Sequence, residues 1–281
     1  MKIIKKALLT SLTASALLSG ASQAAMVEVE VSNLFNAGGL ALTPVWVGFH
    51  DGTFDSFDVG ASSSSSLQAL AENGDVSGVM ADFTASNTNG EQGAILAPDG
   101  FAGAPVFEPG ESATSGIFEI NATDSGYFSF LSMLIPTNDA FIGNDSGTAY
   151  SLFDMNNEFV GLDILVLGSD VWDSGTELNR GYGAPFLAGA DAEERQDENG
   201  VISQHAGLTV LAGGLSIFGG NTPAGYSIDQ AAADFTAQGF EVARITVNQV
   251  QVPVPASAGL FAIGMVALAG FKRRKTSVKV A

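Results

Sequence analysis

Hydrophobic and polar residues alternate in short segments along the middle of the chain. Residues 27–31 alternate strictly between valine and glutamate, a period of two that is typical of a strand with one buried face. Turns rich in glycine, asparagine and aspartate separate the other apolar segments, which are residues 44–50, 117–120, 127–135, 159–167, 208–211 and 242–247. Many short strands with little helix predict a mainly all-β protein, an antiparallel β-sandwich with one or two short helices.

Two segments carry helix signals. Residues 67–74 follow a run of serines that can supply an N-cap, contain good helix formers and end on Asn-Gly. Residues 229–238 contain three consecutive alanines, which favour helix, and predict the second one.

The N-terminus has the order of a secretory signal peptide. Lys2, Lys5 and Lys6 precede an apolar stretch that is short for a membrane span, and a small-residue cleavage pattern ends at Ala24. We therefore expect residues 1–25 to be a signal peptide and the protein to be exported.

The C-terminal residues 251–281 have a second distinctive pattern. A proline-rich lead is followed by residues 256–271, which carry no charge, and then by the basic run 272–275. A helix of that length reaches roughly 24 Å and predicts a short transmembrane helix whose basic end snorkels and stays cytoplasmic. The tail resembles a PEP-CTERM sorting signal, with Val254 in place of the usual Glu. The resemblance implies an exosortase-like processing enzyme as a partner, and both cleavage of the tail and its retention as an anchor remain open.

Between these ends, residues 26–250 are long enough for one domain with a substantial core. All 30 acidic residues of the chain lie there, against the three basic residues Arg180, Arg195 and Arg244, which gives a net charge near −27. Such a surface repels phosphate backbones, so no nucleic-acid partner is expected. It favours cations, basic partners and solubility, and solubility alone explains the charge equally well.

The composition also limits the chemistry. The chain has no cysteine and only two histidines, which excludes thiolate sites and leaves hard oxygen ligands that suit calcium better than zinc. The position of His50 in a predicted strand indicates a packed or hydrogen-bonded side chain. No catalytic motif is present, and we predict no catalytic residue.

Residues 191–200 concentrate five acidic residues around Arg195. The run predicts a solvated charged loop between strands, with an ion-binding or partner-binding loop as the alternative.

Several segments together resemble the spondin N-terminal domain family. They fall in the order of that family and are spread over most of residues 27–248. The matching segments are 29–34, 44–50, 60–74, 132–143, 172–177 and 242–247, and Ala140 stands where the family usually has Trp.

This resemblance implies a C2-like β-sandwich that holds calcium through loop carboxylates at one edge. The positions that correspond to the family motifs are Asp139, Asp173 and Glu177. Calcium takes six to eight oxygen ligands, and Gly175 permits the tight loop between Asp173 and Glu177. Spacing alone supports the other interpretation, in which Asp139 and Asp173 cap turns.

These features favour an exported, non-enzymatic protein of the bacterial cell envelope or extracellular matrix. It would present a calcium-binding domain to extracellular polysaccharide or to a surface protein. Two alternatives stay open: a secreted polysaccharide-acting hydrolase with paired carboxylates, and an envelope building block whose charge serves only solubility.

Overall fold

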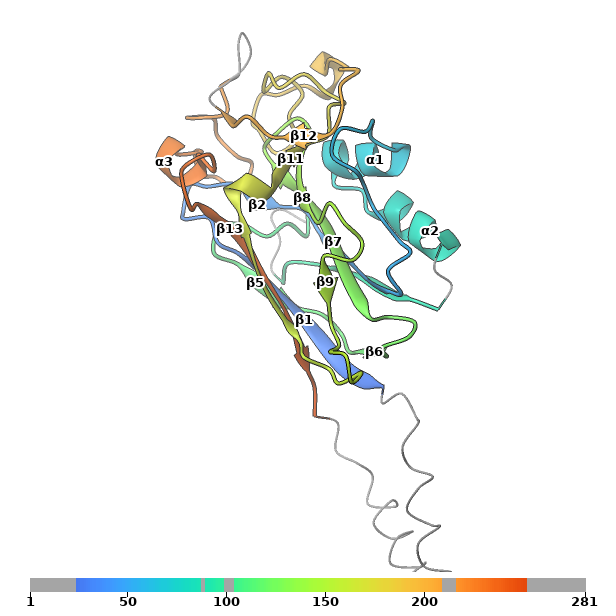
Figure 1. Cartoon of the computed structure of the whole chain (residues 1–281). Coiled ribbons are helices and arrows are strands. Elements are labelled where there is room, and N and C mark those ends of the chain that lie inside the picture. Colours follow the sequence, from blue (N-terminus) through green and yellow to red (C-terminus); the bar gives the residue numbers. More distant parts are fainter. Residues whose placement is uncertain (1–23, 87–88, 99–103, 209–215, 252–281) are drawn as a thin grey trace, which may run out of the picture. The chain divides into compact units, whose positions relative to one another are not determined.

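Two antiparallel sheets build the folded part of the chain in a computed structural model, which describes residues 24–86, 89–98, 104–208 and 216–251 (Figure 1). The first sheet has the order β10-β13-β1-β5, and β6 also pairs with β1. Its strands are β1 (Ala25–Asn33), β5 (Ser112–Thr114), β6 (Phe118–Ile120), β10 (Leu162–Leu167) and β13 (Glu241–Gln249).

The second sheet has the order β12-β11-β8-β7-β3-β4, and β2 and β9 both pair with β7. Its strands are β2 (Ala41–Leu42), β3 (Val45–His50), β4 (Glu91–Ile95), β7 (Tyr127–Ile135), β8 (Ala140–Gly143), β9 (Tyr150–Ser151), β11 (Val171–Asp173) and β12 (Ser203–Gln204). The helices are α1 (Ser65–Asn73), α2 (Ser77–Ser86) and α3 (Gln230–Ala233), with short 3-10 turns η2 (Gly168–Asp170) and η3 (Ala192–Glu194).

The main hydrophobic core joins the two sheets. The first sheet contributes alternate residues of β1 and β13, for example Val29 and Ile245. They are buried in the same cluster as Phe49 and Phe128 of the second sheet. This arrangement explains the period of two in β1, because one face of that strand packs on the core and the other does not.

A second core lies on the other face of the second sheet. Trp46, Leu131 and Phe141 pack there against α1 and α2, and Figure 1 shows the two helices side by side next to β7. Strand β7 is therefore buried on both faces, which is why residues 127–135 form a nearly continuous apolar run.

Local sequence signals place α1 as predicted. The Ser64 side chain accepts a hydrogen bond from the backbone N–H of Leu67, and Gly74 ends the helix with φ at +69°. The predicted second helix is shorter than expected, since α3 spans only Gln230–Ala233.

The prediction missed α2 altogether, and β10 begins three residues later than predicted, after Gly161 with its φ of +72°.

The apolar segment 208–211 lies mostly outside the described residues, as do most of the predicted signal peptide and of the tail 251–281 with its transmembrane helix. Among the residues that the structure describes, none of the helices has the length and apolar character to cross a membrane. The described residues up to Gln249 belong to one compact unit.

Candidate functional site

The candidate site lies where β8 and β11 meet at one end of the second sheet. Asp139 directly precedes β8, and Asp173 ends β11. The register pairs Asp173 with Ala140, and the Ser174 N–H donates to the Asp139 carbonyl at 3.2 Å. Strand pairing therefore makes two acidic residues neighbours although 33 residues separate them in the sequence.

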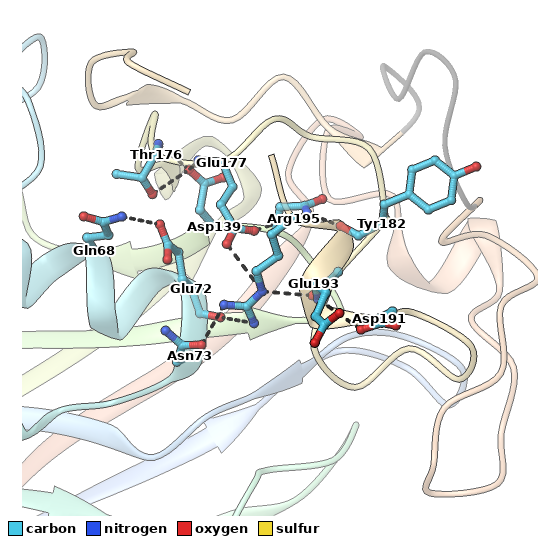
Figure 2. Close-up of polar contacts among 12 residues, drawn as sticks. Gln68, Glu72, Asn73, Asp139, Thr176, Glu177, Tyr182, Asp191, Glu193 and Arg195 are labelled. Carbon is cyan, nitrogen blue, oxygen red and sulfur yellow. Dashed lines mark hydrogen bonds and ion pairs between the residues drawn. The ribbon is translucent and has the colours of Figure 1, made fainter. Parts of the chain in front are cut away.

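Asp139 is fully buried, and its two carboxylate oxygens differ. Oδ2 accepts hydrogen bonds from the backbone N–H groups of Thr176 and Glu177, at 2.8 and 3.1 Å, and from the Thr176 hydroxyl at 3.2 Å (Figure 2). Oδ1 is also buried, but it has no hydrogen-bond partner among the described residues. One oxygen of a buried carboxylate is thus left for a donor or a cation.

Electrostatics favours a proton or a cation at this carboxylate. Burial, followed by repulsion from Asp173, raises the pKa of Asp139 to about 7, and these effects outweigh the three hydrogen bonds that favour the ionised form. An acid in such surroundings gains most from a positive charge placed between it and the second carboxylate.

Asp173 is held by its own loop. Its Oδ1 accepts from the Gly175 N–H at 2.7 Å, with Gly175 at a φ of +69°, and its Oδ2 accepts from the Asn179 side-chain amide. The Asn179 Oδ1 in turn lies 3.2 Å from Nε2 of the buried His205. The Gly207 N–H donates to Nδ1 of His205, so Nε2 carries the proton in the neutral ring.

Burial lowers the pKa of His205, with Asp173 acting in the opposite direction. The hydrogen bonds that run from His205 through Asn179 to Asp173 fix the orientation of the Asp173 carboxylate. They do so without placing a second charge beside it.

Glu177 behaves differently from the two aspartates. Its side chain is 2% exposed, and its Oε1 lies 3.5 Å from Nε of Arg195. Figure 2 draws this ion pair as a dashed line. Its Oε2 accepts from the Asn138 amide at 3.4 Å. Burial raises the pKa of Glu177 to about 7, Arg195 opposes this shift, and Glu72 adds to it.

The structure thus brings Asp139 and Asp173 together, while Glu177 gives Asp139 its backbone N–H and directs its carboxylate to Arg195. Within the described ranges, no group of three or more His, Cys, Asp or Glu side chains is arranged to hold a metal ion. The unpartnered Oδ1 of Asp139 fits an oxygen-liking cation such as calcium. Calcium binding by Asp139, Asp173 and Glu177 stays a prediction.

The role of Arg195 was missed by sequence reasoning. The acidic residues around it are exposed, as predicted for a solvated loop, but its guanidinium points inward. Besides Glu177, it bonds the Asn73 side chain at 2.8 Å and the Glu72 carbonyl at 3.3 Å, at the end of α1. A single basic residue within an acidic run was the signal that could have identified it.

His50 has the structural role that its strand position indicated. It is fully buried, its Nε2 lies 2.9 Å from the Ser129 hydroxyl, and the Gly52 N–H donates to its Nδ1. Burial lowers its pKa to about 4, so the ring is neutral at pH 7.

Comparison with known proteins identifies the family. A family model described as Spondin_N matches residues 40–197, more than half of the chain, and the match includes Asp139, Asp173, Glu177 and Arg195. No curated protein matches the chain. The Spondin_N family is non-catalytic, and its domains are typical of extracellular adhesion and matrix proteins and are generally secreted. The resemblance in sequence is therefore confirmed at the level of the domain, and the chain belongs to the Spondin_N family.

Proposed function

We propose that this protein is an exported component of the cell envelope or extracellular matrix, in which a C2-like Spondin_N sandwich binds calcium and associates with extracellular polysaccharide or a surface protein. The family match supports the adhesive role. The observation that carries the calcium proposal is the buried, unpartnered Oδ1 of Asp139 beside Asp173.

Asp139 and Asp173 would hold the ion, and Glu177 would join them as a third ligand by turning its carboxylate from Arg195 toward the ion. Calcium supplies positive charge and accepts oxygen ligands from loops of irregular shape. The chain itself prepares the site: Thr176 and Glu177 orient Asp139 through their N–H groups, and Gly175 and Asn179 orient Asp173. Asn138 and Arg195 hold the Glu177 carboxylate in the same loop region.

Thermal unfolding of the full-length chain with and without calcium tests this proposal. A ligand that binds only the folded state stabilises it by about 2.7 kcal/mol at 100 times its dissociation constant. We expect calcium to raise the melting temperature of the wild-type protein. Asp139→Asn and Asp173→Asn should each abolish this rise, and Glu177→Gln should make it smaller. Asp154→Asn is the matched control, because it removes one charge from an exposed turn elsewhere. No shift, or an equal shift in Asp139→Asn, would reject the site.

The partner requires a separate experiment. The protein is passed over immobilised exopolysaccharide of the producing cells, with calcium and then with a chelator. Retention that needs calcium and is lost in Asp139→Asn supports a calcium-dependent adhesive role. No retention under either condition rules out polysaccharide as the partner and leaves a surface protein.

The two ends of the chain complete the proposal. A signal peptide over residues 1–25 would direct export, and the segment 251–281 would act as the sorting signal and membrane span. Deletion of residues 252–281 should release the protein into the medium, whereas unchanged retention at the surface would contradict the anchor. The non-catalytic character of the family argues against a polysaccharide hydrolase.

A further inference from the structure

A separate cavity opens where β10 of the first sheet lies near β7, β8, β9 and β11 of the second. Its volume is about 190 Å³, enough for a small head group or the end of one side chain. The cavity is lined by residues of these strands, of η2 and of the loop that follows β8. The aromatic and acidic residues of this lining are Phe130, Asp145, Tyr150, Asp170 and Trp172.

Two half-buried aromatic rings in the lining are held in fixed orientations. The Trp172 Nε1–H donates to the Gly143 carbonyl at 3.1 Å, and its ring meets Phe57 edge-on with 5.9 Å between centroids. The Tyr150 ring packs on Phe130 at 6.2 Å. The aromatic part of the cavity is therefore formed before any ligand arrives.

Two carboxylates belong to the same lining. Asp145 Oδ1 accepts from the Val59 N–H, and Asp170 Oδ2 accepts from the Leu167 N–H, both at 2.9 Å. These bonds orient the two side chains, and the second oxygen of each has no hydrogen bond from another described residue. Asp170 and Tyr150 line the same cavity, and burial and the charge of Asp170 raise the pKa of Tyr150.

Among the residues that the structure describes, no arginine or lysine side chain balances this negative charge. Burial, followed by the charges of Asp58 and Asp145, raises the pKa of Asp55. The three arginines of the described residues are bonded elsewhere, to Gln196, Glu177 and Asp163, and the described part of the chain contains no lysine.

Aromatic faces beside carboxylates recognise organic cations, because the ring face is electronegative and the cation's alkyl groups pack on it. Calcium prefers a shell made of oxygen atoms alone, so this cavity differs in chemistry from the Asp139 site. We propose that the cavity lined by Tyr150, Trp172, Asp145 and Asp170 binds an organic cation, an ammonium or guanidinium head group from a partner molecule. This inference goes beyond the proposed calcium-dependent adhesion and does not depend on it.

The experiment uses the full-length chain and three cationic probes, N-acetyl-lysine methylamide, N-acetyl-arginine methylamide and choline. N-acetyl-norleucine methylamide, which is neutral and of similar length to the lysine probe, measures apolar binding alone. We expect dissociation constants for at least one cation that are about tenfold lower than for the neutral probe. The best cation tells whether basic side chains or quaternary ammonium groups are the source.

The variant Asp145→Asn/Asp170→Asn keeps an oxygen acceptor for both backbone N–H groups and removes two charges. It should weaken cation binding about tenfold, whereas Asp124→Asn/Asp154→Asn, with the same loss of charge at turns outside the cavity lining, should change it less than about twofold. Equal weakening in both double variants would show that the general negative field attracts the probes, and would overturn the proposal.

A measurement on the wild-type chain does not depend on variant folding. The chain has two tryptophans, and Trp46 is buried with its Nε1–H bonded to Gln92. Cation binding should shift the indole N–H resonance of Trp172 and leave that of Trp46 in place. A titration in which neither resonance moves, or in which the neutral probe shifts Trp172 equally, would reject the site.

Discussion

Asp139 is completely buried, and among the described residues one of its carboxylate oxygens accepts three hydrogen bonds and the other accepts none. The donors all come from Thr176 and Glu177, so they fix the carboxylate but do not neutralise it. A residue in this state weakens the fold when it is ionised and gains from a proton or a cation.

Asp139→Asn should therefore stabilise the calcium-free protein at pH 8, on the order of 1 kcal/mol. The folded-state pKa of Asp139, about 7, lies above its ordinary value, so the folded state keeps a proton that the unfolded state loses. Wild-type stability falls from this cause as pH rises from about 4 to about 7, and the variant lacks the effect. Urea unfolding with a chelator, at pH 5 and pH 8, measures the difference. Equal stability of the two proteins at pH 8 would argue against a strained carboxylate.

His50 predicts the opposite dependence on pH. Its folded-state pKa is about 4, below the unfolded value of about 6.5, so the unfolded state takes up a proton first as pH falls. The stability that His50 contributes is present above about pH 6.5 and is lost as pH falls to about 4. The difference in unfolding free energy between wild type and His50→Gln should shrink by an amount on the order of 2 kcal/mol over this range. Urea unfolding at several pH values measures it. A constant difference would mean that His50 titrates alike in both states.

Among the elements, α1 and the segment that contains η3 are joined through one side chain. Arg195 contacts Glu177 and also the last residues of α1, Glu72 and Asn73 (Figure 2). It thereby places a positive charge at the C-terminal end of a helix, where the carbonyl groups lack helical partners.

Removal of this cation should leave a buried carboxylate without its partner. Arg195→Met should destabilise the fold by about 2 kcal/mol at pH 8, less than for a fully buried pair because Arg195 is 21% exposed. The effect should decrease below pH 7, where Glu177 takes up a proton.

Two further variants separate the causes. Arg195→Met/Glu177→Gln should recover most of the loss, and Arg180→Met, which loses only a bond to Gln196, should cost about 0.5 kcal/mol or less. Denaturant unfolding of the four proteins decides the matter. A double variant as unstable as Arg195→Met alone would point to lost packing rather than to an unpaired charge.

The whole molecule carries far more negative than positive charge in the region between its two ends, 30 acidic residues against three arginines. Self-repulsion at this density opposes compaction, and salt screens it over about 10 Å at 0.1 M.

The melting temperature should therefore rise as sodium chloride increases from 10 to 300 mM in the presence of a chelator. Calcium at 1 mM should raise it further, by more than magnesium at the same ionic strength, because binding adds to screening. Differential scanning calorimetry makes the comparison. An equal rise in melting temperature with calcium and with magnesium would mean that divalent cations act by charge screening alone.

Short-range signals allowed several elements to be predicted from the sequence. The alternation of residues 27–31 lies within β1, the run 127–135 coincides with β7, and Ser64 and Gly74 bound α1. Each of these signals acts within a few residues of chain. Helix α2 escaped prediction because only Val79 and Phe83 of its residues are buried, which is too little for a clear helical period.

By itself the sequence determined the mainly β character, the Spondin_N family and the acidic surface, because periodicity, capping, motif order and charge are written along the chain. Only the tertiary structure decided which acids meet. The register of β8 and β11 places Asp173 beside Asp139, and the inward turn of Arg195 takes Glu177 into an ion pair. Both contacts depend on strand pairing and burial between distant segments, which local patterns do not encode.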